Sequence, residues 1–245
     1  MNDDALLYPP LNVLKKVAND VWIVDSGPIR PLGMRLPIRM TVIRLADGGL
    51  LLHSPTEFHA DLKSELEQMG PISHLVAPNS AHWTFLSAWQ EQVPDAMTWA
   101  APGLRNRRQV RRSGVRLDRD LRPGAAGWAK EIMPIIVPGV GGFAEVALYH
   151  QPSRTLVLVD LIQNLETEKL PPSLRLPARF AGVTAPHGRA PIYLRAIVKA
   201  KGHDAKTAGR SLAALEPDRV IFSHGAWFQQ DGATRLRRSI AWLLR

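Results

Sequence analysis

Two short apolar segments, far apart in the chain, each lead directly into a side chain that can bind a metal ion. Residues 156–159 precede Asp160, and residues 219–222 precede a Ser-His-Gly sequence whose histidine is His224. Short runs of β-branched and aliphatic residues are typical of buried strands. In α/β proteins such strands deliver polar side chains to one end of a sheet and assemble a site there. We therefore expect Asp160 and His224 to converge on one point, together with His82.

The composition is that of a globular protein with a full core and no disulfides. Of the 245 residues, 45% are hydrophobic and 22% are charged, and the chain has no cysteine. These values are ordinary for a globular domain, and the lack of thiols restricts any metal site to histidines and carboxylates. No apolar run approaches the ~20 residues that span a bilayer, and the acidic start of the chain does not resemble a signal peptide. We expect one domain, residues 1–245, in the cytoplasm, without a membrane partner.

Much of the net charge of +9 comes from one arginine cluster, which consists of Arg105, Arg107, Arg108, Arg111 and Arg112. Such a cluster is compatible with binding of nucleic acid, acidic lipid or an anionic substrate, and also with a solvated helix face. We favour the solvated face, because the chain shows no nucleic-acid-binding signature and its aromatic residues lie elsewhere. A nucleic-acid partner is therefore not expected.

The apolar pattern sets the order of the elements. It predicts strands at residues 21–24, 40–44, 50–53, 74–78, 98–101, 132–137, 145–150 and 155–160 and a last strand that ends at His224. It predicts helices at residues 55–70, 81–92, 191–200 and 204–215 and at the C-terminus. Ser54 is predicted to cap the first helix and Asn79 the second. Residues 1–20, 27–37 and 161–190 are predicted to form a lead-in, a loop and an irregular excursion.

This order matches neither regular strand–helix alternation nor an all-β pattern. Two mixed β-sheets packed face to face, with helices on the outside, fit it best. The fold class we expect is α/β (α+β), a four-layer αββα sandwich.

Three motifs of the chain resemble those of the metallo-β-lactamase superfamily, and the resemblance covers Val21 to the C-terminus. The superfamily's "pGHTpGs" segment precedes a hairpin that ends in an aspartate; here residues 138–142 (Pro-Gly-Val-Gly-Gly) precede the hairpin that ends at Asp160. Its strand-terminal "HG" is similar to His224-Gly225. Its "THxHxDH" signature corresponds in place to residues 77–83, whose Pro-Asn-x-x-His-Trp sequence resembles a divergent branch of the superfamily. The resemblance implies an αββα fold and a metal site.

The chain departs from the signature at the ligand positions of one of the two metal ions. Superfamily members typically hold two ions, and the first takes two signature histidines and the histidine of "pGHTpGs". Here those places hold Pro78 and Ser80, or Ala77 and Asn79, depending on the register, together with Val140. The first metal site therefore looks lost.

The second ion takes the remaining signature ligands, the hairpin aspartate and the "HG" histidine. His82 falls among those ligands in either register, at the signature aspartate or at the last histidine. The resemblance thus implies that His82, Asp160 and His224 hold one ion. Two histidines and one carboxylate leave positions open, as catalytic sites do, and suit Zn²⁺, Fe²⁺ or Mn²⁺. A cation near the site, Arg219 or the arginine cluster, would then have to assist.

Each candidate ligand also has a purely structural interpretation. His224 can be a strand-end histidine bonded to backbone, Asp160 a turn cap, and His82 a first-turn residue of an amphipathic helix. His150 ends the strand next to that of Asp160 and is the reserve candidate for a ligand or proton shuttle. The other histidines are expected to be structural or solvated: His53, His59, His74, His187 and His203.

The leading hypothesis is a metallo-β-lactamase-like protein with a depleted, mononuclear site that hydrolyses a small molecule, with an anionic one as a candidate. The alternative is a non-catalytic, metal-free relative that binds a ligand or a protein partner in the same cleft. A nucleic-acid-processing role is a third hypothesis, which only the positive charge suggests.

Overall fold

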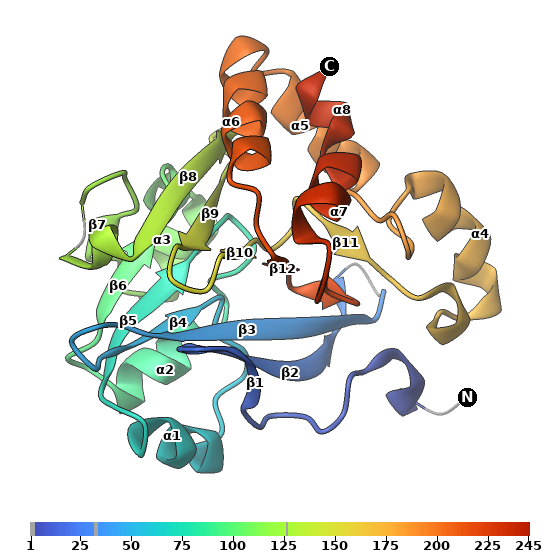
Figure 1. Cartoon of the computed structure of the whole chain (residues 1–245). Coiled ribbons are helices and arrows are strands. Elements are labelled where there is room, and N and C mark those ends of the chain that lie inside the picture. Colours follow the sequence, from blue (N-terminus) through green and yellow to red (C-terminus); the bar gives the residue numbers. More distant parts are fainter. Residues whose placement is uncertain (1–2, 32–33, 126) are drawn as a thin grey trace.

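The computed structural model describes residues 3–31, 34–125 and 127–245 and shows two β-sheets packed face to face (Figure 1). The larger sheet has the order β1 (Lys15–Ala18), β2 (Val21–Ile29), β3 (Leu36–Arg44), β4 (Leu50–His53), β5 (Ile72–Ala77), β6 (Met97–Ala100) and β7 (Arg119–Asp120). The smaller sheet has the order β12 (Arg219–Ile221), β10 (Thr155–Val157), β9 (Ala144–His150) and β8 (Ile132–Pro138). A separate pair joins β11 (Gln163–Asn164) to β13 (His224–Gly225).

The larger and the smaller sheet each contain both parallel and antiparallel strands. Neighbouring strands from β1 to β4 are antiparallel and those from β4 to β7 are parallel. In the smaller sheet β8, β9 and β10 are antiparallel, and β12 lies parallel to β10. Every residue of β4 and β9 is buried, as expected for strands whose sheet is covered on both faces.

Helices cover the outer face of each sheet. The larger sheet is covered by α1 (Ala60–Glu67), α2 (Leu86–Gln92) and α3 (Arg108–Ser113). The smaller sheet is covered by α5 (Ile192–Lys199), α6 (His203–Ala214), α7 (Gly232–Ser239) and α8 (Ala241–Leu244). Short 3-10 turns are η1 (Asp3–Leu6), η3 (Leu104–Asn106), η4 (Gly127–Lys130) and η5 (Thr167–Lys169). A further helix, α4 (Pro172–Ala181), lies at the right-hand side of Figure 1.

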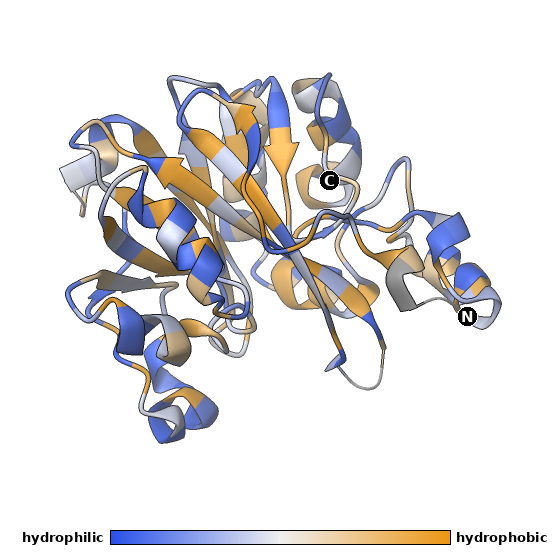
Figure 2. Cartoon of the chain, turned by 90° about the horizontal axis from the view of Figure 1, so that it is seen from below, coloured by the Kyte–Doolittle hydropathy of each residue, from blue (hydrophilic) through white to orange (hydrophobic). Residues whose placement is uncertain are grey.

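Three apolar layers hold the sandwich together. The middle layer lies between the sheets, where Leu51 and Trp99 of the larger sheet meet Leu148 and Ile221 of the smaller one. The two outer layers lie between each sheet and its helices. In Figure 2 the strands are the most continuously hydrophobic part of the chain, whereas the helices carry hydrophilic faces. The four-layer αββα sandwich expected from the sequence is confirmed.

Two predicted helix starts are wrong, and both errors fall in the segments that carry Ser54 and His82. The helix expected from residue 55 begins at Ala60, and Ser54 does not cap it. Ser54 has a φ of 56°, outside the helical region, and its hydroxyl contacts His82 instead. The helix expected from residue 81 begins at Leu86, because residues 80–85 form turns that Asn79 organises.

Other boundaries also differ from the prediction. The strand expected to end at Asp160 ends at Val157, and the one expected to end at His224 ends at Ile221. Residues 27–29 and 36–37, at the two ends of the predicted loop, belong to β2 and β3, the lead-in contains β1, and the predicted irregular excursion contains α4 and β11. Among the described residues no helix is long and apolar enough to cross a membrane.

Candidate metal centre

His82, Asp160 and His224 come together at one end of the sandwich. Asp160 follows β10 by three residues, His224 opens β13, and His82 lies in the turn between β5 and α2. The Nε2 atoms of His82 and His224 each lie 3.3 Å from an oxygen of Asp160, Oδ2 and Oδ1 respectively. One ligand atom from each residue lies within 4.8 Å of the others, so the three could hold one metal ion. The convergence expected from the sequence is present.

Hydrogen bonds at the far side of each ring orient the two imidazoles. The Nδ1 atom of His224 lies 2.8 Å from the Pro37 carbonyl oxygen, and because a carbonyl only accepts, Nδ1 carries the proton. In the neutral ring this leaves Nε2 with a free lone pair directed at Asp160. The Nδ1 atom of His82 lies 2.7 Å from Ser54 Oγ. Partners of this kind fix the ring orientation of metal-binding histidines.

Asn79 links Asp160 to the backbone that carries His82. Its amide Nδ2 donates to Asp160 Oδ2 at 2.7 Å and reaches Glu145 Oε2 at 3.4 Å. Its Oδ1 accepts from the backbone N–H groups of Ala81 and His82, at 2.8 and 3.0 Å. The side chain is fully buried. One residue therefore sets the positions of two candidate ligands.

Glu145 holds the loop that carries Asp160. Its buried carboxylate accepts from the backbone N–H groups of Val159, Asp160 and Leu161, at 2.9 to 3.3 Å. Asp160 thus extends from a loop fixed by three hydrogen bonds, although it lies beyond the end of its strand.

The electrostatics of the site favour an ionised Asp160. Burial alone would raise the pKa of Asp160, but the positive charge available to His82 and His224, with hydrogen bonds from both, holds that pKa well below its usual value. Burial, and then the negative charge of Asp160, raise the pKa of Glu145 to about 7, against three backbone N–H groups that lower it. Burial also lowers the pKa of His53, next to His82, to about 3, so that this ring stays neutral.

The contacts favour one of the two registers of the signature. In the register with Asn79 at the second histidine and His82 at the last one, both side chains contact Asp160 Oδ2. In the other register the last histidine becomes Trp83, whose Nε1 donates to the Ser80 carbonyl instead. In the favoured register Asn79 aligns with the second signature histidine, and its amide Nδ2 donates to Asp160 Oδ2.

The candidate ligands open into a small, largely apolar pocket. Its cavity volume is about 140 Å³, and its apolar lining includes Ile29, Leu36, Ile38, Phe85 and Tyr193. No lysine or arginine is among the described residues that line it. The expectation that a cation near the site assists the metal is therefore wrong for this pocket.

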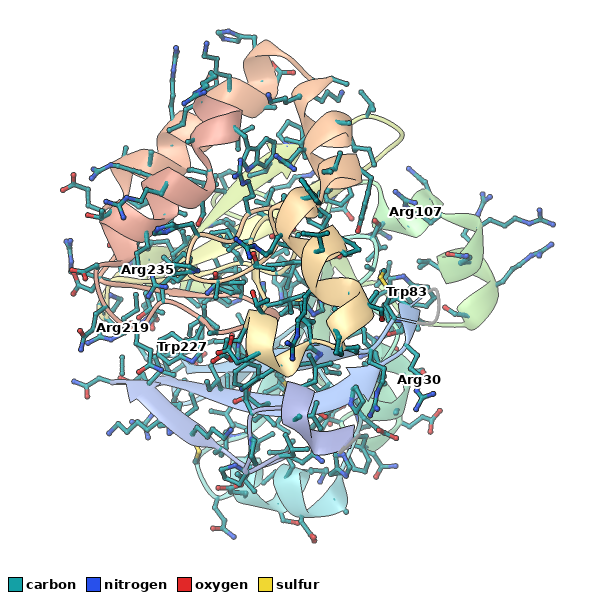
Figure 3. The ribbon with its side chains drawn as sticks, turned by 90° about the vertical axis from the view of Figure 1, so that its right-hand side faces the viewer. Arg30, Trp83, Arg107, Arg219, Trp227 and Arg235 are labelled. Carbon is teal, nitrogen blue, oxygen red and sulfur yellow. The ribbon has the colours of Figure 1, made fainter. Side chains whose placement is uncertain are left out.

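The arginines proposed for that task are held elsewhere. Arg105 pairs with Asp120, and Arg219 donates to the Ser153 carbonyl. In the view of Figure 3, Arg107 lies at the right-hand edge of the molecule and Arg219 at the left-hand edge. His150, the reserve candidate, is at the end of β9 remote from Glu145 and contacts Ser153 at 2.7 Å. It is not part of the site.

The sequence does not reveal most of the residues that support the three ligands. It predicts Asn79 and Ser54 as helix caps and indicates no role for Glu145 or Pro37. A glutamate inside a fully buried strand is the one available signal, because a buried carboxylate needs hydrogen-bond partners. The contacts themselves join residues up to 187 positions apart, as between His224 and Pro37.

Replacing Ser54 by alanine is expected to weaken metal binding about 10- to 100-fold, because His82 loses the partner that orients its ring. Titration with Zn²⁺ by calorimetry measures the effect. The chain contains a matched control in Ser153, which contacts His150 at the same 2.7 Å distance away from the site. Ser153→Ala should leave the affinity unchanged; equal losses in the two variants would contradict a positioning role for Ser54.

The two-sheet sandwich with its covering helices is the metallo-β-lactamase fold. A metallo-β-lactamase from Pontibacter korlensis superposes with a TM-score of 0.65 at 14% identity, covering 97% of this chain and 98% of that one. One from Erythrobacter litoralis gives 0.65 at 12% identity, with coverage of 97% and 98%. The mono-zinc form of FIM-1 from Pseudomonas aeruginosa gives 0.58 at 15% identity and covers 94% of each chain.

The chain belongs to the family described as "Domain of unknown function (DUF4336)", whose model matches residues 18–191. That span contains His82 and Asp160, and His224 lies beyond it. No curated protein sequence matches the chain.

Proposed function

We propose that the chain binds one divalent transition metal ion, Zn²⁺ or Fe²⁺/Mn²⁺, through His82, Asp160 and His224, and that it acts as a hydrolase on a small substrate. The observation that carries the proposal is the orientation of His224. Its Nδ1 proton is committed to Pro37, so Nε2 directs a lone pair at a carboxylate oxygen only 3.3 Å away. Two acceptors at that distance repel each other unless a proton or a metal ion lies between them. A metal ion satisfies both.

The residues around the three ligands have separate tasks. Ser54 and Pro37 hold the imidazoles, while Asn79 and Glu145 hold Asp160 and its loop. A bound divalent ion supplies Lewis acidity toward a substrate oxygen and lowers the pKa of water. The apolar lining excludes bulk water from the rest of the pocket, which strengthens the electrostatic interactions inside it.

The pocket supports a small, uncharged substrate better than an anionic one. Its volume of about 140 Å³ lies below the roughly 300–1,000 Å³ of sites for drug-sized ligands. Apart from the three candidate ligands, its described lining consists mostly of apolar side chains with a few uncharged polar ones, and it offers no lysine or arginine to pair with an anion. We expect turnover of phenyl acetate by the metal-loaded protein and none of phenyl phosphate.

Metal analysis of the purified protein tests the proposal. The wild type should carry close to one transition metal ion per chain, and His224→Ala should carry none. His150→Ala is the matched control, since this buried histidine lies outside the site, and it should retain the metal. A wild type that takes up no ion and whose melting temperature does not respond to added Zn²⁺ or Fe²⁺ would instead favour the metal-free relative. In that case a proton shared by Asp160 and the imidazoles is the cation.

A further inference from the structure

The helix α4 exposes apolar side chains instead of burying them. None of its ten residues is buried. Leu176 and Phe180, one turn apart on the same side of the helix, are 61% and 78% exposed. Arg175 and Arg179 follow the same spacing one position earlier and form a basic stripe beside the apolar one. In Figure 1 the helix projects from the right-hand side of the molecule.

The start of α5 continues this exposed apolar area toward the metal site. Ile192 and Tyr193 are 56% and 64% exposed, and Tyr193 also lines the pocket. The two helices are in contact, because Arg195 Nη2 donates to the Ala181 carbonyl at the end of α4. We call the area formed by Leu176, Phe180, Ile192 and Tyr193 the α4–α5 surface. Among the described residues, eight large hydrophobic side chains are exposed, and four of them form this surface.

The segment that carries this surface is also strongly basic. Residues 165–202 contain seven lysines and arginines, and their acidic residues are Glu166 and Glu168. The net charge of this segment is therefore 7 − 2 = +5, more than half of the chain's +9. Glu166 is already paired with Lys169. An apolar stripe flanked by basic side chains, on a helix whose remaining positions are mostly small or polar, is the pattern of helices that lie in a membrane interface. Anionic headgroups attract such basic segments.

We propose that the α4–α5 surface docks onto an anionic lipid bilayer, with Leu176 and Phe180 inserted below the headgroups. A second copy of the chain fits less well, because two such surfaces would bring like charges together. The expected absence of a membrane partner rests on the lack of a segment that spans a bilayer, whereas α4 would lie in the bilayer surface. Docking would turn the mouth of the pocket, at Tyr193, toward the lipid. The inference is independent of the proposed hydrolase activity.

Co-sedimentation with vesicles tests the docking. The wild type should bind vesicles of phosphatidylcholine mixed with phosphatidylglycerol, should not bind phosphatidylcholine alone, and should dissociate as salt is raised. The Leu176→Ser/Phe180→Ser variant should bind about tenfold more weakly or worse, because two apolar side chains no longer leave water. Val13→Ser/Met133→Ser, which removes exposed apolar residues elsewhere, is the control and should bind like the wild type.

Both double variants should keep the melting temperature and the metal content of the wild type. This control shows that weaker vesicle binding comes from the changed surface and not from unfolding. Three results overturn the proposal: no binding of the wild type to either vesicle, equal binding of the Leu176→Ser/Phe180→Ser variant, or binding that ignores salt. Sedimentation velocity without lipid tests the alternative that the surface binds a second copy of the chain. A dimer that disappears in the Leu176→Ser/Phe180→Ser variant would assign the surface to a second copy instead.

Discussion

Replacing Arg39 by methionine is expected to lower the free energy of unfolding by about 3–5 kcal/mol and to weaken metal binding. Arg39 is buried in β3 and pairs with Asp25 through Nη2 at 2.6 Å. Its Nη1 donates to the carbonyls of Phe222 and Gly225, at 2.8 and 2.9 Å, on either side of His224. Methionine removes the donor that both carbonyls share and one of the cations that Asp25 contacts.

The effect on the metal follows from the same contacts. The segment around His224 is tied to β3 by the guanidinium of Arg39, by Ser223 Oγ, which donates to the Arg39 carbonyl, and by the Pro37 carbonyl. Without the guanidinium the segment is less restrained, so the Nε2 atom of His224 is held less firmly beside Asp160. Zinc titration under conditions where the variant is fully folded should show this loss of affinity.

Arg44 supplies the control for this experiment. It is in the same strand and pairs with Asp20 at 2.6 Å, but both side chains are exposed. An exposed ion pair contributes about 0–1 kcal/mol, so Arg44→Met should change stability little and metal affinity not at all. Denaturant unfolding of the two variants measures the difference. Equal stability losses, or an unchanged zinc affinity in Arg39→Met, would show that the buried pair does not support the site.

Asp160 and His224 could be identified from the sequence as candidate ligands because each follows an apolar run, whereas His82 is identified through the resemblance to the superfamily signature. Asp160 and His224 stand out because a buried strand has no structural need for a polar residue at its end. The sandwich followed from the count and order of the elements. Both depend on local patterns, and the structure confirms the sandwich and brings Asp160 and His224 together, although several element boundaries differ from those expected.

The supporting residues could not be predicted, because their contacts are long-range. Arg39 reaches carbonyls 183 and 186 positions away, and nothing in the pattern of β3 distinguishes it from a solvated arginine. Ser54 and Asn79 have the side chains of helix caps, which is the role that their local sequence predicts. The same hydrogen-bonding capacity that would cap a helix instead orients His82 and Asp160. The local pattern identifies the chemistry of these side chains correctly, but not their partners.

Replacing Asn79 by aspartate is expected to make the stability of the protein depend on metal. The buried Asn79 amide donates to Asp160 at 2.7 Å and approaches Glu145 at 3.4 Å, and aspartate removes that donor and adds a third carboxyl group. Two unit charges 4 Å apart repel by about 4 kcal/mol at an effective dielectric constant near 20. In the presence of a chelator at pH 8, the unfolding free energy should fall by about that amount. A divalent ion neutralises the added charge, so saturating Zn²⁺ should recover most of the loss.

The comparison with Asn79→Ala separates charge from the lost hydrogen bond. Alanine also removes the donor, which costs about 1–3 kcal/mol of unfolding free energy, but it adds no negative charge. Zn²⁺ should therefore stabilise Asn79→Ala no more than it stabilises the wild type. Because protonation of the added carboxyl relieves the repulsion, the deficit of Asn79→Asp should also shrink as the pH is lowered from 8 toward 5, and that of Asn79→Ala should not. Thermal and denaturant unfolding with and without Zn²⁺ measure both dependences. A chelated Asn79→Asp protein as stable as the wild type at pH 8 would mean that this position is not electrostatically coupled to Asp160, and the single-metal site would lose the contact that distinguishes it.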